Sequence, residues 1–246
     1  MVNNKHFITY KVENLKKILN NVSLLFGYGY NCNSYLITSS NGESLLIDSG
    51  LGSFDATWGY TLNNPLQELL TVIKSYNITN VFLTHAHLDH VGGIASLTSG
   101  QREKVEIYCH EVEKKYLELP DSHYIDPLMR SSLESISISK SFANKENFGF
   151  GDLNFEVIHT PGHTQGSICL YEPTKKWLFS GDCVFPQGSF GRVDFPGSDA
   201  EKMLSSLEIL TSLEIESLFA GHMELLITDA QESIKMSFRN AKLMIG

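Results

Sequence analysis

Four residues that can bind a metal ion lie within one short segment of the chain, THAHLDH. They are His85, His87, Asp89 and His90, and the three histidines are drawn from only nine in the whole chain. Side chains at positions i and i+2 of an extended strand point to the same face, so His85 and His87 can converge on one ion. Asp89 and His90 follow where the chain must turn toward a pair of glycines, and a turn can direct both side chains to a second point nearby.

Imidazole nitrogen and carboxylate oxygen together suit zinc, iron, manganese or nickel. The spacing differs from H-E-x-x-H, in which two histidines share one face of a helix. Taken singly, each residue has an ordinary structural explanation, such as a hydrogen-bonded strand histidine or, for Asp89, a helix N-cap. Four such residues in one segment favour a metal site.

Three later motifs each place one further ligand type after a predicted strand. His163 follows a Pro-Gly turn in TPGH, Asp182 follows a glycine in SGD, and His222 follows a glycine in AGH. Proline and glycine allow the tight turn that presents His163 outward. A single histidine or aspartate at a strand end is more often structural, so these three gain meaning only in combination with THAHLDH.

The order of these motifs, THAHLDH, TPGHT, SGD and a GH before a C-terminal helix, resembles that of the metallo-β-lactamase superfamily. LLIDSG, which contains Asp48, is similar to the Asp-Thr/Ser-Gly element that ends a strand in that family. FGRVDFPGSD, with Arg192 and Asp194, looks like a loop of the branch that contains glyoxalase II and persulfide dioxygenase. The resemblance covers roughly residues 21 to 240 and places the chain in the glyoxalase II-like branch.

The resemblance implies two divalent metal ions, with zinc favoured over iron and manganese. Asp89 and Asp182 are the predicted catalytic carboxylates, because a carboxylate on the metal can relay a proton to the leaving group. The implied ligands are His85, His87 and His163 for the first ion, Asp89, His90 and His222 for the second, and Asp182 as the bridge between them.

Other residues of the same motifs are given supporting roles. Asp48 would orient a ligand or a loop from outside the ligand set. His159 is either a similar partner or an ordinary hydrogen-bonded histidine. Arg192 and Asp194 would form a structural pair, and Cys183 would be a small buried apolar residue.

Sequence periodicity predicts the elements that must position these residues. Hairpins are predicted around Asn41-Gly42 and at Glu172–Lys176, and helical spacing of apolar residues is found within 61–77. Helix, strand and helix alternate after residue 199. We find no repeat and no Pro-, Gly- or Ser-rich linker, so residues 1–246 are predicted to form one domain of layered α/β class. The resemblance implies the αββα sandwich of the metallo-β-lactamase fold, with the metals at one edge between two sheets.

The segment 111–148 is less regular than its surroundings and forms either a lid over the site or an ordinary surface insertion. If it shapes the substrate site, Tyr124, Met129 or Phe142 would face that site.

Charge and cysteine content bound the partners and the compartment. A net charge of −9 argues against a polynucleotide substrate, although bound metals would still attract a small anion. The four cysteines form no C-x-x-C pair, the N-terminus lacks an apolar signal region, and no apolar run could cross a bilayer. We expect a cytoplasmic protein with a small-molecule substrate and with neither nucleic acid nor membrane as a partner.

The predicted activity is hydrolysis of a small acyl substrate by a metal-bridged hydroxide. Two cations can lower the pKa of a shared water from 15.7 to about 7, and no serine or cysteine nucleophile is then needed. The resemblance favours a thioester, as in a hydroxyacylglutathione hydrolase. Glyoxalase II also has a C-terminal helical domain that binds glutathione, whereas only one helix is predicted after His222.

The alternative is a persulfide dioxygenase with one iron held by His85, His163 and Asp182. A lactonase, a phosphodiesterase and a non-catalytic metal-binding protein rank lower.

Overall fold

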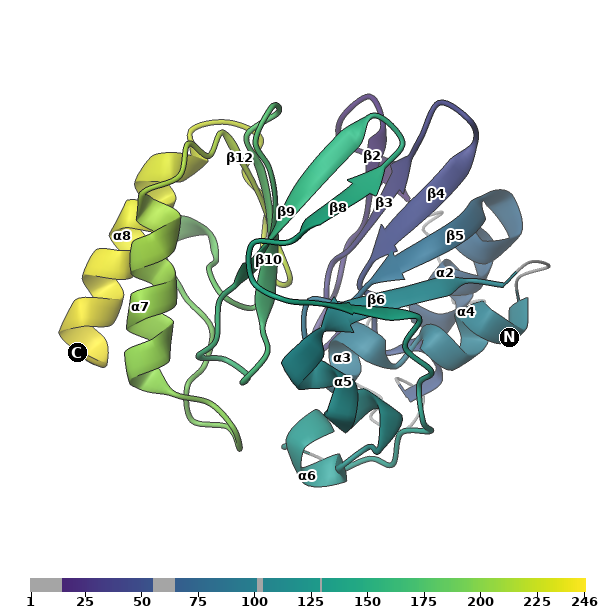
Figure 1. Ribbon diagram of the computed structural model, residues 1–246, viewed down its shortest axis with the longest axis horizontal. Coiled ribbons are helices and arrows are strands. Elements are labelled where there is room, and N and C mark those ends of the chain that lie inside the picture. Colours follow the sequence, from purple (N-terminus) through teal and green to yellow (C-terminus); the bar gives the residue numbers. More distant parts are fainter. Residues whose placement is uncertain (1–14, 55–64, 101–103, 129) are drawn as a thin grey trace, which may run out of the picture.

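Two β-sheets face each other at the centre of the molecule, and helices cover the outer face of each (Figure 1). The computed structural model describes residues 15–54, 65–100, 104–128 and 130–246. Among them, no helix is long and apolar enough to cross a membrane.

The first sheet has seven strands in the order β1-β2-β3-β4-β5-β6-β7. Its first four strands are antiparallel, and β4 to β7 pair in parallel. The turn between β3 and β4 contains Asn41-Gly42, which confirms the predicted hairpin. The bounds are β1 Lys16–Lys17, β2 Val22–Leu25, β3 Ser34–Thr38, β4 Glu43–Ile47, β5 Asn77–Phe82, β6 Glu106–His110 and β7 Lys140–Phe142.

The second sheet has five strands in the order β12-β11-β10-β9-β8. The β10–β11 pair is the second predicted hairpin, and β12 joins β11 in parallel. The bounds are β8 Asn147–Phe150, β9 Leu153–His159, β10 Ile168–Glu172, β11 Trp177–Gly181 and β12 Ser217–Ala220.

The helices divide between the two outer faces. The first sheet is packed against α2, α4 and α5, and the second against α7 and α8, which lie at the left of Figure 1. The helix bounds are α2 Pro65–Ser75, α3 Leu88–Val91, α4 Ile94–Gly100, α5 Glu111–Glu118, α6 Ser122–Ile125, α7 Ala200–Thr211 and α8 Ala230–Met244, with short 3₁₀ turns η1 Gly52–Phe54 and η2 Pro186–Gly188.

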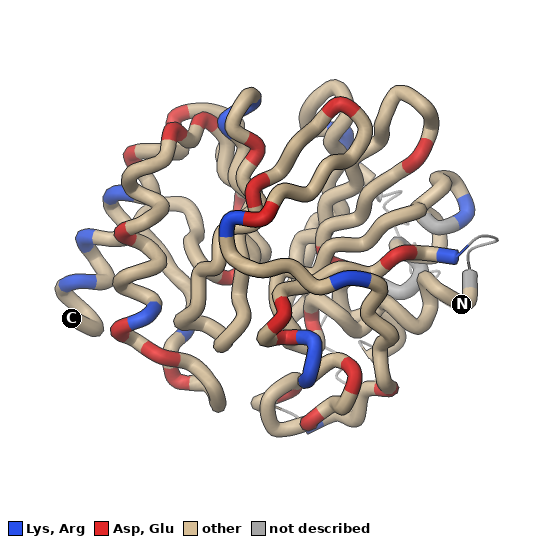
Figure 2. The backbone as a smooth tube through the Cα atoms, viewed as in Figure 1, with Lys and Arg blue, Asp and Glu red and all other residues tan. Residues whose placement is uncertain are grey.

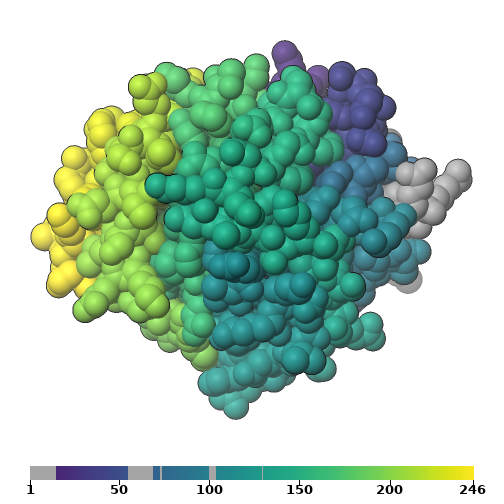
Figure 3. Space-filling model, in the orientation of Figure 1, coloured from purple at the N-terminus to yellow at the C-terminus, as the bar shows by residue number. Residues whose placement is uncertain are grey.

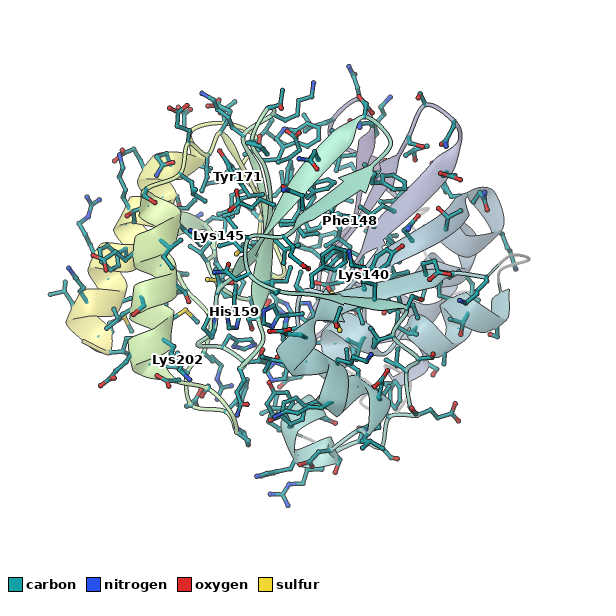
Figure 4. All side chains as sticks on the ribbon, viewed as in Figure 1. Lys140, Lys145, Phe148, His159, Tyr171 and Lys202 are labelled. Carbon is teal, nitrogen blue, oxygen red and sulfur yellow. The ribbon has the colours of Figure 1, made fainter. Side chains whose placement is uncertain are left out.

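The period-2 alternation of strand side chains produces the layers. In β10, Ile168 and Leu170 point into the core between the sheets, whereas Cys169 and Tyr171 belong to the core beneath α7 and α8. Aromatic rings fill much of the space between the sheets, including Phe148, which is labelled there in Figure 4. These layers confirm the predicted αββα sandwich.

The segment 111–148 is more ordered than its sequence suggested, because it contains α5, α6, β7 and the start of β8. Its strand β7 forms the edge of the first sheet, paired in parallel with β6. The prediction that Phe142 faces the substrate site is wrong, since its ring is 2% exposed and packs between the sheets. Met129 lies outside the described residues.

The candidate ligands all follow the carboxyl ends of strands. Those strands are β5 in the first sheet and β9, β11 and β12 in the second. β4 is parallel to β5, and β9, β11 and β12 run in one direction. The carboxyl ends of these strands meet at one edge of the sandwich. The two halves of the chain pack side by side, from purple to blue and from green to yellow in Figure 3. The ligands from both halves therefore meet across the gap between the sheets.

Candidate metal centre

The structure brings together all seven predicted ligands from four separate loops. His85 and His87 lie in the loop after β5 rather than in the strand itself, which corrects the sequence-based expectation. The backbone of His87 is nevertheless extended, with φ −67° and ψ 145°, so both side chains still converge. Asp89 and His90 lie on the short helix α3, which directs them to a neighbouring point.

Three imidazoles, those of His85, His87 and His163, form what we call the imidazole subsite. The Nε2 atom of His85 lies 3.1 Å from Nδ1 of His87, which lies 2.9 Å from Nε2 of His163. All three residues are buried, at 0%, 4% and 3% exposure. Three nitrogens that converge in this way can share one cation.

Asp89, His90 and His222 form a second cluster, the carboxylate subsite. Oδ2 of Asp89 lies 3.0 Å from Nε2 of His222 and 3.6 Å from Nε2 of His90. Asp182 lies between the subsites: its Oδ1 is 3.3 Å from His90 Nε2, and its Oδ2 is 3.5 Å from both His163 and His222. One carboxylate thus contacts both clusters.

Asp48 sets the tautomers of two of these histidines. As a carboxylate it can only accept, and it accepts from the Thr84 hydroxyl at 2.8 Å and from His90 Nδ1 at 2.7 Å. Because the Thr84 hydroxyl already donates its only proton to Asp48, it must accept a hydrogen bond from His85 Nδ1 at 3.0 Å. In its neutral form each ring is therefore protonated on Nδ1, which directs the Nε2 lone pair toward the centre.

A backbone carbonyl does the same for the third ring. His163 Nδ1 donates to the carbonyl of Arg192 at 2.9 Å, so its Nε2 lone pair also faces inward. Burial, reinforced by His90, holds the pKa of His85 well below its usual range, and burial with His163 lowers the pKa of His87 to about 3. Neutral imidazoles are the form that binds metal.

The bridging carboxylate is ionised in the same surroundings. Burial opposes ionisation of Asp182, but the positive charges that His222 and His90 carry when protonated hold its pKa well below the usual value. The acidic neighbours in turn raise the pKa of His90 and of His222 against the effect of burial, so a cation at this subsite would take the place of those protons. Gly221 allows this approach, because a Cβ at that position would overlap Asp182 Oδ1 and the His90 ring. The glycine of AGH is thus a packing requirement of the site as well as a turn residue.

Buried atoms that lack partners test whether a metal fits. His90 Nε2, Asp182 Oδ1 and His87 Nε2 are buried without a hydrogen-bond partner. The first two face each other, and such orphans are costly unless something satisfies them. A cation that displaced the proton of His90 would be bound by its Nε2 lone pair and by the Asp182 oxygen, which would satisfy both atoms, so the residues present fit divalent metals.

Glu113 on α5 is a site-building residue that sequence reasoning missed. It is fully buried and accepts from Ala86 N at 3.1 Å, Thr164 Oγ1 at 2.7 Å, Gly166 N at 2.7 Å and Tyr124 OH at 2.9 Å. Burial raises its pKa, and these four donors oppose the shift. Glu113 therefore ties the His85–His87 loop to the His163 loop.

Residues with predicted supporting roles lie close by. Arg192 and Asp194 form a bidentate pair, with nitrogen–oxygen distances of 2.9 and 2.7 Å, as predicted. His159, at the end of β9 and labelled in Figure 4, belongs to none of the candidate metal clusters. Its Nε2 donates to the Gln165 carbonyl, and its ring stacks on His110 at 4.0 Å. Cys183 is buried in the core beneath α7 and α8.

A pocket of about 310 Å³ opens beside both subsites. It exposes His87, Asp89, His163, Asp182 and His222 to a substrate. The segment 111–148 contributes a wall through residues 125–128. Tyr124 supports that wall from behind, since its hydroxyl bonds Glu113 and the Gln165 amide.

Comparison with known proteins agrees with this geometry. Residues 27–222 match the family model described as the metallo-beta-lactamase superfamily. The hydroxyacylglutathione hydrolase GloC of Haemophilus influenzae is 36% identical over 174 residues, covering 68% of this chain and 78% of its own. The probable metallo-hydrolase MJ0888 of Methanocaldococcus jannaschii is 30% identical, covering 90% and 98%. The crystal structure of TTHA1623 in a di-iron-bound form has 27% identity and a TM-score of 0.66, covering 85% and 96%.

The chain therefore belongs to the metallo-β-lactamase superfamily. It is a metal-dependent hydrolase of that superfamily, with buried clusters of histidine and aspartate at the expected edge of the fold.

Proposed function

We propose that this chain hydrolyses thioesters of small acyl groups with the help of two divalent cations, zinc being favoured. The observation that carries the proposal is the position of Asp182, one oxygen of which lies 3.3 Å from His90 while the other lies 3.5 Å from His163. The substrate class is supported by the similarity to GloC, whose name is hydroxyacylglutathione hydrolase.

In this proposal the imidazole subsite would hold one ion and the carboxylate subsite the other, and Asp182, which contacts both clusters, would be shared by the two. Such a pair of cations supplies a water of lowered pKa and polarises the oxygen that gains charge. Asp48, through Thr84 and His90, keeps the ligand lone pairs directed inward. Asp89 lines the pocket and is 23% exposed at its side chain, so it can reach both solvent and substrate.

The reaction balances without an enzyme nucleophile. The oxygen of one water forms a bond to the thioester carbonyl carbon, and the carbon–sulfur bond breaks with its electron pair leaving on sulfur. The departing sulfur takes up one proton of that water through Asp89 or Asp182, and the other proton is released as the carboxylic acid ionises.

Charge and cysteine content support the remaining expectations. The net charge of −9 favours a small molecule over a polynucleotide, and acidic residues are distributed over both halves in the view of Figure 2. All four cysteines are buried free thiols, which supports a cytoplasmic location where thiols remain reduced.

Metal content tests the proposal most directly. The protein is purified under low oxygen without added metal, and ions per chain are counted by mass spectrometry beside a thioester hydrolysis assay. Two ions per chain with thiol release that a chelator abolishes are expected. One iron per chain, with oxygen uptake on a persulfide and no thioester cleavage, would instead identify a persulfide dioxygenase.

A further inference from the structure

Outside the metal site, most of the side chains that form the wall of the substrate pocket are apolar or aromatic, and Asp126 and Arg192 are the charged exceptions. The wall is contributed by the β2–β3 loop, by α6 and the turn after it, and by the β11–α7 loop. Two of its residues, Tyr30 and Leu128, are 47% and 49% exposed and therefore stand at the mouth. The apolar and aromatic lining residues beyond α3 and the ligands are Tyr30, Ile125, Pro127, Leu128, Phe185, Phe190 and Phe195.

The charged residues of this wall are already engaged with the protein. Among the described residues, Arg192 is the one Lys or Arg that lines the pocket. Its Nε and Nη2 donate hydrogen bonds to the two carboxylate oxygens of Asp194. Its guanidinium carbon also lies 4.1 Å from the ring centre of Phe195. Asp126 is buried and accepts from Ser131 N at 2.7 Å.

These contacts decide what the wall can recognise. A hydroxyl buried against apolar side chains loses its hydrogen bonds to water and gains none, which costs binding energy. An alkyl or aryl group gains from the same surroundings, by about threefold to fourfold in affinity for each buried methylene. A cation already paired with a carboxylate is also a poor receptor for the carboxylates of glutathione.

We infer that the substrate's acyl group is an apolar alkyl or aryl group rather than a hydroxyacyl group, and that the thiol it is released from need not be glutathione. This inference rests on the proposed thioesterase function and adds its substrate class. The thioester carbonyl of the substrate would lie toward the candidate metal ligands, and its hydrocarbon would lie against Ile125, Leu128 and the phenylalanines.

Four thioesters test it, combining two acyl groups with two thiols. Hexanoyl and lactoyl groups are each attached to glutathione and to N-acetylcysteamine, a small neutral thiol, and kcat/KM is measured with the metal-loaded protein. We expect hexanoyl to exceed lactoyl by about tenfold or more on both thiols. A preference for lactoyl on either thiol would overturn the inference while leaving the thioesterase proposal intact. Cleavage of none of the four would overturn both.

Exposed leucines provide a matched pair of variants. Leu128→Asp places a charge at the pocket mouth, and because Leu128 is half exposed the fold should tolerate it. It should lower kcat/KM for hexanoyl esters about tenfold more than it lowers that for lactoyl esters. Leu119→Asp changes a leucine that is 81% exposed and does not line the pocket, so it should alter neither. Equal losses on both acyl groups in Leu128→Asp would contradict the inferred position of the hydrocarbon.

Discussion

The imidazole and carboxylate subsites differ in their access to solvent and in what holds their side chains. His85, His87 and His163 are at most 4% exposed. In the carboxylate subsite only His90 is fully buried, whereas the side chains of Asp89 and His222 are 23% and 24% exposed. In the imidazole subsite the rings of His85 and His163 are oriented by Thr84 and by a backbone carbonyl. Asp89 and His222, by contrast, both line the pocket and contact each other at 3.0 Å.

This difference predicts two ions of unequal affinity. A preorganised set of neutral imidazoles loses little freedom on binding, so it should hold its ion more tightly. The more exposed pair, Asp89 and His222, must be ordered by the ion itself. The carboxylate subsite should therefore lose its ion first on chelation, and the predictions below test what separates or joins the two.

Replacing the residue shared by both subsites should have the largest effect. Asp182→Ala removes both bridging oxygens and leaves His90 and His163 without their common partner. We expect kcat/KM to fall by more than the roughly 10–100-fold that loss of a ligand-orienting residue costs. Metal content after gel filtration should fall below two ions per chain. Asp152→Ala, at an exposed turn between β8 and β9, is the matched control. Two retained ions and full activity in Asp182→Ala would refute the bridging role.

Asp48→Asn should weaken both subsites together, because Asp48 contacts His90 directly and His85 through Thr84. Asp48 has a left-handed backbone with φ 57°, which asparagine also tolerates, so the loop should keep its shape. Asparagine, however, has only one side-chain oxygen that can accept, and its amide nitrogen can only donate. Affinity for each ion should fall by about 10–100-fold, as measured by competition with a metal indicator.

Asp229 offers a control for the backbone of that variant. It has φ 59°, is exposed and makes no capping hydrogen bond, so Asp229→Asn should change neither affinity. If Asp48→Asn weakened only one ion, the proposed coupling through Thr84 would be wrong.

The seven candidate ligands and a layered α/β class could be predicted from sequence because the motifs and periodicities that indicate them are local, whereas the αββα sandwich was predicted from the resemblance of those motifs to a known family. Each ligand follows a strand and a short turn motif, and period-2 patterns indicate which strands are buried. The partners that orient the ligands were less accessible. Thr84 acts only because β4 and β5 pair in parallel, which brings Asp48 beside it from 36 positions away. No local pattern records such a contact.

Glu113 shows where a signal was present in the sequence. EVEKKYLE has the composition of a solvated helix, yet Glu113 and Leu117 are four residues apart and both are fully buried. An acidic residue on the apolar face of a helix must have buried donors, and these lie 27 to 53 positions away in the ligand loops or 11 away in Tyr124. Phe142 was misplaced for the opposite reason, because the short strand β7 has too few residues to show a period.

Glu113→Gln should affect one subsite and spare the other. Its contacts to Ala86 and Thr164 hold the loops of His85, His87 and His163, and an amide presents two donors where only acceptors fit. The affinity of the imidazole subsite for its ion should fall by about tenfold, whereas that of the carboxylate subsite should change little. Glu172→Gln is the control, since Glu172 is also buried but accepts from Lys175 in the β10–β11 turn. Equal loss of stability in both variants without a change in affinity would reduce Glu113 to a structural role.

Acid should weaken the support of the imidazole subsite through His110, which caps α5 by accepting from Val112 N. Burial, and then the neighbouring His159, lower the pKa of His110 from 6.5 to about 4. Its uncharged form therefore stabilises the fold above pH 6.5, and this contribution is lost as the pH falls from 6.5 toward 4. His110→Asn keeps a capping acceptor and removes the titration. Urea unfolding of the metal-free proteins at pH 7 and pH 4.5 should show a loss smaller by about 1 kcal/mol in the variant, since solvent near His159 screens part of the effect. Equal losses would mean that His110 is already protonated, or indifferent to its charge, in the native state.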